Sequence, residues 1–540
     1  MKSQGKRAVF LILLLAAVLR LPNLETIPFW EFDEGYNLNY AWNLANGHIV
    51  WYTIRYAFIP HPPLFYMILA VIIKLFGYTL YPARVFAVTL SLGSTLLLYL
   101  AGTKLVNKNV GLLAALLYAI YPHAIFFGRM NYNNNLLAFM IMLALYLHLL
   151  EGRWRTLSYA VIGLSAVVEL SGAALILTAW ILSRIFDKKN FLKNMGIALA
   201  PGIIFTLIML YITPDYFVHD LLYQLNRFGF TPTVLALSAC ALAIFYLASD
   251  RLPEIYVRIR DFLRREITIL FSEYDSIAWN YGLLAILAAA HFYSSRWLFH
   301  EFSEGCFFGS FDYYWLGLAG LLLVRGSIKR NTALLFALPM LLVTLKIGRF
   351  DHMCIPLYPL FSLGGGVLLP ELNGFLRRAA SLLAGSKILI YICSTILLAY
   401  PFTYVLYADF GGFVLGRTLR HEDVKSMVEA AEYVNARISG ADFVLTTSNL
   451  ARFVRGNATV FIQGVAIDEP IVYYPAFPAE RFLYNVSYRN AKYIVIPGYD
   501  GLSWLATVEN RTYRNISEEI GGWGVEMEIG PYFVYRNPEK

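Results

Sequence analysis

The stretch RVFAVTLSLGSTLLLYLAG, residues 84–102, contains 19 residues and a single charge, which stands at its first position. About 20 predominantly apolar residues suffice for a helix to cross a bilayer. The rest of the chain has the same character, with 58% hydrophobic residues, 15% charged residues and a mean hydropathy of +0.55 over 540 residues. This composition excludes a string of soluble domains and predicts a polytopic membrane protein.

Outward from this run, the sequence predicts thirteen transmembrane helices, counting short and tilted ones. The thirteen runs are 8–22, 84–102, 110–127, 135–150, 157–170, 172–186, 195–213, 231–248, 277–294, 311–325, 332–346, 354–370 and 388–405. Because the count is odd, the two ends of the chain are expected on opposite sides of the membrane.

The distribution of Lys and Arg gives the expected orientation. The basic clusters lie on one side of this map, at 2–7, 103–108, 152–156, 184–193, 251–265, 325–330 and 377–387. Since cytoplasmic loops carry the excess of Lys and Arg, we predict a multi-pass cell-membrane protein with a cytoplasmic N-terminus and an extracytoplasmic C-terminal domain.

The apolar run 64–76 does not fit as a span, because a helix crossing there would invert every later basic loop. We interpret it as an interfacial or re-entrant helix on the outer face, within a first outer loop of about 23–83. The predicted transmembrane domain thus covers 1–410. Residues 411–540 are predicted to form a soluble α/β domain, with a helix over 422–438 and strands in ADFVLTTSN (441–449) and ATVFIQGVAI (458–467).

Four N-x-S/T sequons, at Asn457, Asn485, Asn510 and Asn515, all lie in this C-terminal region. Their asymmetric distribution agrees with an extracytoplasmic tail. The four cysteines have no paired spacing, so neither a disulfide framework nor a zinc knuckle is indicated.

Polar residues that could carry chemistry gather at the predicted outer ends of the spans. EFDEGYN places the adjacent carboxylates Asp33 and Glu34 just beyond the first span, and IPHPPLFY places His61 before the helix at 64–76. The alternative interpretation is that the two carboxylates lie in a solvated turn and that His61 has only a structural role. A carboxylate beside cations at one membrane face nevertheless suits group transfer from a lipid phosphate.

The cations expected at this face are Arg129, Lys346 and Arg349, since the predicted outer loops otherwise hold few basic residues. Snorkelling to lipid phosphates is their structural alternative. Arg129, Arg349 and His61 are the predicted ligands of a donor phosphate, with Asp33 and Glu34 as catalytic carboxylates. Weaker candidates for substrate contacts are Tyr36, Asn134, Lys346 and His352.

Taken together, FDEGYN (32–37), HPPLFYMILAVIIKLFG (61–77), Arg84, GRMNYNNNLL (128–137) and GRFDHMCIPLYPL (348–360) resemble the polyprenyl-phosphate-sugar glycosyltransferases of the GT-C fold. The resemblance is to the protein O-mannosyltransferase and aminoarabinose (lipid A) transferase group, and it covers about residues 8–405. It implies that a sugar is transferred with inversion from a dolichyl or undecaprenyl phosphate to a protein, glycan or lipid acceptor. The sugar that the resemblance favours is a mannose-like hexose. By the resemblance, Asp33 is the general base or orients the acceptor.

Two departures from the family pattern concern the metal and the acceptor. Asn134 stands where the second motif usually has an aspartate, and an amide is a poorer metal ligand than a carboxylate, which leaves a divalent metal cofactor open. The tail also lacks the sugar-binding repeats of eukaryotic protein mannosyltransferases and the WWDYG signature of oligosaccharyltransferases. Membrane lipids are expected partners, and nucleic acid is not.

Two other classes of function compete with the enzyme. A secondary transporter or lipid flippase would also have many spans with polar residues, but transporters place them near mid-bilayer in two related halves. Here the polar motifs lie at the outer ends of the spans, and the halves show no symmetry. An inactive scaffold is favoured only if Asp33 proves dispensable.

Overall fold

The computed structural model describes residues 2–25, 32–47, 62–150, 152–212, 327–347, 351–383, 424–468, 486–498 and 510–540, with residue 484 and short pieces at 214–222 and 317–324. The described chain forms two compact units. The first contains 1–20, 89–128 and 133–411, and the second contains 21–88, 129–132 and 412–540.

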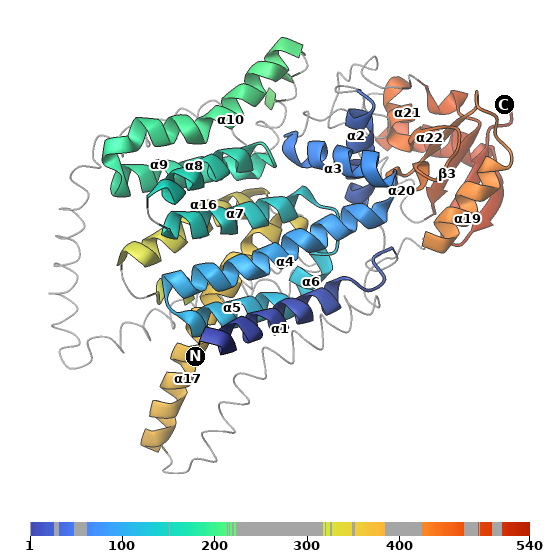
Figure 1. Ribbon diagram of the computed structural model, residues 1–540. Coiled ribbons are helices and arrows are strands. Elements are labelled where there is room, and N and C mark those ends of the chain that lie inside the picture. The colour runs from blue at the N-terminus through green and yellow to red at the C-terminus, as the bar shows by residue number, and fades with distance from the viewer. Residues whose placement is uncertain are drawn as a thin grey trace. The chain divides into compact units, whose positions relative to one another are not determined.

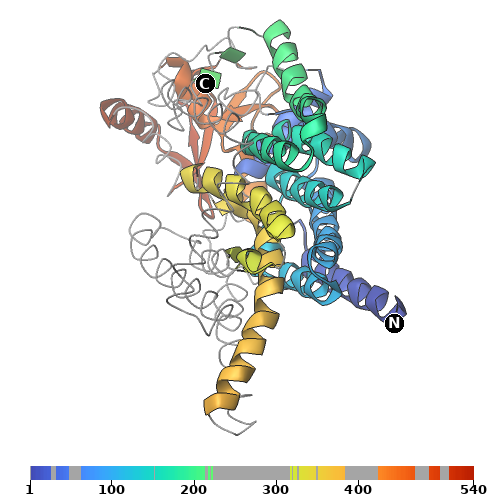
Figure 2. The same ribbon diagram turned by 90° about the vertical axis from the view of Figure 1, so that its left-hand side faces the viewer.

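The first unit is a bundle of apolar helices. Its helices lie stacked beside one another, with α8 against both α7 and α10, and α5 against both α1 and α17 (Figure 1). Figure 2 shows α17 as one continuous rod. The bounds are α1 Lys2–Arg20, α5 Lys108–Ile120, α6 Pro122–Phe127, α7 Asn133–Leu149, α8 Arg153–Ala166, α9 Leu175–Phe186, α10 Phe191–Ile212, α16 Ser327–Ile347 and α17 Tyr358–Leu383, with α4, Leu80–Leu105, shared between the units.

Within the described residues, three segments are long and apolar enough to cross a bilayer: 80–105, 188–212 and 352–370. Shorter apolar helices occupy 64–76, 108–120, 133–149, 170–184 and 332–344. Helix α10 leaves Ile203, Leu207 and Tyr211 exposed, as expected for a face that meets lipid. The predicted spans 231–248, 277–294 and 388–405 and most of 311–325 lie outside the described residues, so the count of thirteen stays a prediction.

One predicted span is divided in two. The run 110–127 forms α5 and α6, separated at Tyr121, which adopts extended backbone angles (φ −66°, ψ 119°). The reason is Pro122, because a proline disfavours helical geometry in the residue before it and is well placed at the first position of a new helix.

Arg20 closes the first predicted span and is fully buried. Its guanidinium donates to the carbonyls of Tyr118 (3.0 Å) and Ala119 (2.8 Å), and to the Ser91 hydroxyl (2.9 Å). The two carbonyls belong to the last turn of α5, where backbone acceptors have no partner within the helix and a positive charge is favoured. Arg20 therefore fastens the end of α1 to the C-terminus of α5.

Arg20→Met is expected to destabilise the protein by about 1 to 3 kcal/mol for each acceptor that it leaves buried and unsatisfied. Arg20→Lys should recover part of the loss, because an ammonium can reach only some of the same acceptors. Thermal unfolding in detergent measures both. Arg7→Met, which alters an exposed arginine of the same helix, is the control, and equal melting temperatures for Arg7→Met and Arg20→Met would contradict the assignment.

The second unit joins the first outer loop to the tail. In the first outer loop the described helices are α2 (Phe32–Ala45) and α3 (Leu64–Phe76), which pack on each other. Helix α3 has 13 residues, so it is about 20 Å long, against about 30 Å of hydrocarbon. One face of α3 buries Phe65 and Leu69, whereas Val71 and Leu75 stay exposed, a pattern that suits the interfacial helix predicted from the sequence.

The tail contains a five-stranded mixed sheet in the order β2-β1-β3-β5-β4. Strands β1 (Phe443–Thr446), β2 (Asn457–Val460) and β3 (Tyr493–Pro497) are parallel, and β5 (Tyr532–Arg536) pairs antiparallel with both β3 and β4 (Val525–Ile529). The helices of this region are α19 (Val424–Asn435), α20 (Ser448–Ala451), α21 (Phe461–Asp468) and α22 (Asn510–Gly522).

The predicted strand 458–467 is wrong over most of its length. Strand β2 ends at Val460, and Phe461–Asp468 form the helix α21. The buried residues Phe461, Gly464 and Val465 have the spacing of one helical face. A short apolar run is ambiguous, because β-branched residues favour a strand until the partner surface is known.

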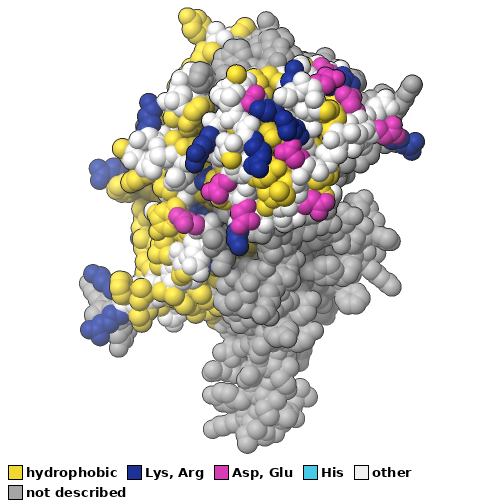
Figure 3. Space-filling model, turned by 90° about the vertical axis from the view of Figure 1, so that its right-hand side faces the viewer, with side chains coloured by type: hydrophobic (Ala, Val, Ile, Leu, Met, Phe, Trp, Pro, Cys, Tyr) yellow, Lys and Arg dark blue, Asp and Glu magenta, His cyan; other side chains and the backbone are white. Residues whose placement is uncertain are grey.

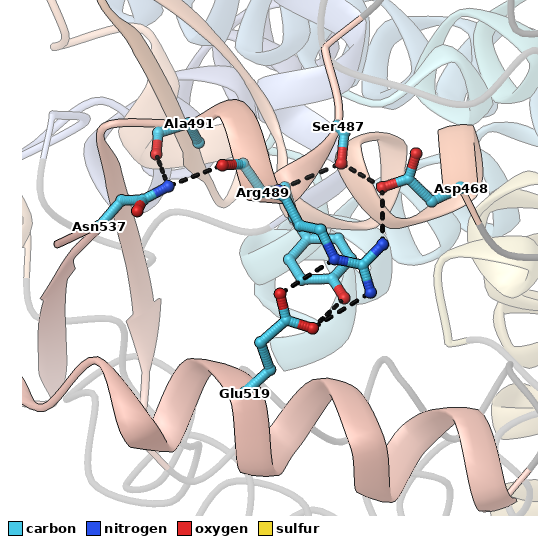
Figure 4. Close-up of polar contacts among 7 residues, drawn as sticks. Asp468, Ser487, Arg489, Ala491, Glu519 and Asn537 are labelled. Atoms are coloured by element: carbon cyan, nitrogen blue, oxygen red, sulfur yellow. Dashed lines mark hydrogen bonds and ion pairs between the residues drawn. The ribbon is translucent and has the colours of Figure 1, made fainter. Parts of the chain in front are cut away.

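A cluster of ion pairs connects α21, α22 and the loop before β3. Arg489 donates to both oxygens of Glu519, at 2.9 and 3.1 Å, and contacts Asp468 at 3.5 Å (Figure 4). The hydrogen bonds from Arg489 lower the pKa of the Glu519 carboxyl. Figure 3 shows acidic and basic side chains interspersed over this face of the tail, which is typical of a surface in contact with water.

Candidate functional site

The first turn of α2 carries both predicted catalytic carboxylates. Consecutive residues of a helix point about 100° apart, so Asp33 and Glu34 cannot face the same way. Glu34 is completely buried, whereas Asp33 is partly exposed. The two carboxylates therefore have different surroundings.

Glu34 forms a buried ion pair with Arg84, and both side chains are fully shielded from solvent. Arg84 Nε donates to Glu34 Oε1 at 2.9 Å, and Nη2 donates to Oε2. The backbone N–H of Asn131 also donates to Oε1, at 2.7 Å, and Arg84 Nη1 donates to the Leu24 carbonyl at 2.9 Å. A carboxylate whose two oxygens already accept these bonds is poorly placed to take a proton from a substrate, so the geometry suits Glu34 as an anchor of α2.

The segment 129–132 is fixed to α2 by several contacts. Asn37 of α2 donates to the Asn131 carbonyl at 2.7 Å, and Tyr66 of α3 donates to Asn37 Oδ1 at 3.1 Å. Arg129 is buried, and its Nη2 donates to the Pro22 carbonyl. Arg129 and the two carboxylates therefore belong to one compact part of the protein.

Asn131 differs from its neighbours in one respect. Its side chain is completely buried, and among the described residues neither its amide nitrogen nor its amide oxygen has a hydrogen-bond partner. Leaving a buried polar group without a partner costs about 1 to 3 kcal/mol. Such an arrangement is compatible with a ligand that supplies the missing partners when it binds.

The other predicted site residues are distributed as follows. Tyr36 is buried in α2, within the same unit. Asn134 is buried in α7 and His352 is partly exposed in the 3₁₀ helix Asp351–Leu357, and both belong to the first unit. His61 and Arg349 lie outside the described residues, as does the side chain of Lys346.

Sequence reasoning missed the importance of Arg84, Asn37 and Asn131. A signal for Arg84 existed, because a lone arginine at the start of an apolar run must be paired when it is buried. Glu34 precedes it by 50 residues, and sequence spacing gave no reason to choose Glu34 over other acidic residues.

Within the part of the chain that the structure describes, no three His, Cys, Asp or Glu side chains stand close enough together to hold a metal ion. Asp33 and Glu34 supply two carboxylates at most, and Arg84 already occupies one of them.

Residues 60–213 match the family model described as dolichyl-phosphate-mannose-protein mannosyltransferase. No curated protein sequence is significantly similar to the chain.

Solved structures match over nearly the whole chain. ArnT from Cupriavidus metallidurans, bound to undecaprenyl phosphate, superposes with a TM-score of 0.53 at 15% identity, over 98% of each chain. The Archaeoglobus fulgidus oligosaccharyltransferase with Zn and sulfate gives 0.54 at 15% identity, over 93% of this chain and 70% of the other. The AglB complex from the same organism, with an inhibitory peptide and a dolichol-phosphate, gives 0.53 at 14% identity, over 100% and 75%.

Matches at identities this low establish the fold alone, and the family match adds a sequence relationship over the end of the first outer loop and the helices that follow it, up to residue 213. The chain therefore has the GT-C membrane fold, and the resemblance to the GT-C polyprenyl-phosphate glycosyltransferases that its motifs predict is confirmed.

Proposed function

We propose that the protein transfers a sugar from a polyprenyl phosphate to an acceptor hydroxyl or amine on the extracytoplasmic side of the membrane. The observation that carries this proposal is the separation of the two adjacent carboxylates, with Glu34 held by Arg84 and Asp33 left partly exposed on the same helix turn. A fixed helix with one accessible carboxylate provides a positioned general base. The family match over 60–213 supports a mannose-like sugar.

In the proposed reaction, Asp33 accepts a proton from the acceptor as the acceptor atom attacks the anomeric carbon of the sugar. The bond from that carbon to the phosphate oxygen breaks, and the polyprenyl phosphate leaves with the bonding electrons. Attack from the side opposite the phosphate inverts the anomeric configuration. Arg129, with Arg349 and His61, would neutralise the departing phosphate.

Known structures with this fold support the choice of donor. ArnT has been solved with undecaprenyl phosphate, and AglB with a dolichol-phosphate. Helix α3 adds a second argument, because its exposed apolar face is suited to contact with lipid, where a polyprenyl chain would arrive.

The proposal is tested with purified protein in liposomes that contain one labelled donor at a time: dolichyl phosphate mannose, dolichyl phosphate glucose or undecaprenyl phosphate aminoarabinose. Membrane extract supplies the acceptor. The expected result is sugar transfer with release of polyprenyl phosphate, and we expect dolichyl phosphate mannose to be the preferred donor. Movement of an intact donor between leaflets without cleavage would instead indicate a flippase and would overturn the proposal.

Arg129→Ala is expected to weaken binding of polyprenyl phosphate by about 1.5 to 3 kcal/mol for each charged hydrogen bond lost. Arg129→Lys should rescue binding only in part, because lysine lacks the planar fork that matches phosphate oxygens. Titration with undecaprenyl phosphate measures both variants, and Arg349→Ala extends the test. The control is Arg153→Ala at an exposed site, and unchanged affinity in both the Arg129 and Arg349 variants would leave these arginines with a structural role only.

A further inference from the structure

The tail contacts the helix that carries the predicted base. The short helix α20, Ser448–Ala451, packs against α2, which belongs to the same compact unit. Thr447 caps α20 by accepting from the Leu450 N–H at 3.3 Å, and Asn449 within it is fully buried. Arg452 follows directly at the end of α20, so the fold of the tail delivers a guanidinium beside the first outer loop.

The surroundings of Arg452 come from both parts of the unit. Burial lowers the pKa of Arg452 to about 10, while Tyr78 and Glu34 raise it and Arg84 lowers it further. Tyr78 in turn donates a hydrogen bond to Asn39 of α2. Burial raises the pKa of the Tyr78 hydroxyl, and Arg452 opposes this effect. Arg452 thus lies within electrostatic range of the Glu34–Arg84 pair.

The charge of this cluster is positive. It contains two guanidiniums, of Arg84 and Arg452, and one carboxylate, of Glu34, which already accepts two bonds from Arg84. Tyr78 adds no negative charge near neutral pH, because its pKa is raised. A partly buried positive cluster favours an anion.

A second observation also indicates a ligand at this place. The backbone of Asn131 is bonded to Glu34, and its buried side-chain amide has no hydrogen-bond partner within the described chain. Glu34 thus belongs to the positive cluster and also accepts a hydrogen bond from the backbone of Asn131, the residue whose side-chain amide lacks a partner. In the proposed reaction, both the donor and the leaving group contain an anion, the phosphate group of the polyprenyl carrier.

We propose that Arg452 of the tail binds the phosphate group of the polyprenyl carrier, so that the C-terminal domain completes the site formed by the first outer loop. The identity of the anion rests on the proposed function. Arg452 would act together with Arg129, and its guanidinium is held over the ring of Phe453, with the guanidinium carbon 4.6 Å from the ring centroid.

The test is a titration of the full-length protein in nanodiscs with undecaprenyl phosphate, comparing Arg452→Met with Arg455→Met. Methionine keeps much of the apolar side-chain volume and removes the charge. Arg455 is exposed and only three residues away, so its replacement controls for a general loss of positive charge. We expect Arg452→Met to lower the affinity about 10- to 100-fold and Arg455→Met to leave it unchanged. Uncharged undecaprenol should bind all variants alike.

Unchanged affinity in Arg452→Met, or an equal loss in both variants, would overturn the proposal. If Arg452→Met proves unfolded by its melting temperature, Arg452→Lys replaces it, with a smaller but measurable loss expected, and wild-type affinity in that variant would count against the guanidinium. Competition by inorganic phosphate shows whether the headgroup suffices. Because this titration requires no turnover, it decides the role of Arg452 even if no sugar donor is cleaved and the proposed function fails.

Discussion

Asp33→Asn is expected to reduce the rate of sugar transfer by about 10² to 10⁴ while leaving expression and donor binding close to wild type. The amide has nearly the same shape as the carboxylate but cannot accept the proton of the acceptor. Because Asp33 is partly exposed at the first turn of α2, the change should cost little folding stability. Single-turnover kinetics with saturating donor separates the chemical step from binding.

Two controls accompany this experiment. Glu25→Gln removes an exposed carboxylate of the same outer loop and should leave the rate unchanged. Asp33→Glu keeps the carboxylate but moves it by one methylene, so an intermediate rate is expected. Full activity of Asp33→Asn would remove Asp33 from the reaction and would favour the interpretation of the protein as a scaffold or carrier.

Breaking the buried pair is expected to have the largest effect on stability. Glu34→Gln leaves the charge of Arg84 buried without a carboxylate partner, and Arg84→Met leaves the charge of Glu34 buried without a guanidinium partner. Each change is expected to lower the free energy of unfolding by about 3 to 5 kcal/mol. The double variant removes both charges, so it should be more stable than the sum of the single effects implies. Unfolding in detergent micelles measures the free energies.

The same variants distinguish an anchor from a catalyst. If Glu34 positions α2, Glu34→Gln should lower stability and transfer together, and the double variant should restore part of both. Lys425→Met, which breaks an exposed pair with Glu429, is the matched control and should change little. Wild-type stability combined with lost turnover in Glu34→Gln would return Glu34 to the catalytic role that the sequence predicts.

Much of the architecture could be read from the sequence, because its physical causes are local. The length and apolarity of the runs predicted α4 and α10, and the prolines before Leu64 predicted the start of α3. The break between α5 and α6 at Pro122 was not predicted, because the continuous apolar run 110–127 was interpreted as one span. In contrast, α21 could not be told from a strand, since its helical face is defined only by what it packs against.

The site could be predicted only in its parts. The predicted topology indicated that Asp33 and Arg129 lie at one face, and the hydrogen bonds between α2 and the segment 129–132 hold these two parts of one unit together. The pairing of Glu34 with Arg84 and the approach of Arg452 join residues far apart in the chain. Such contacts depend on the tertiary fold, and a single sequence contains no signal that selects one distant partner over another.

The union of α2 with the tail has a consequence for the biogenesis of the protein. Residues 32–45 are made hundreds of residues before the strands that complete their unit. At about 5 to 20 residues per second, the interval is on the order of a minute. During that interval α2 lacks the tail segments that share its unit, so the unit is complete only after its strands have been made.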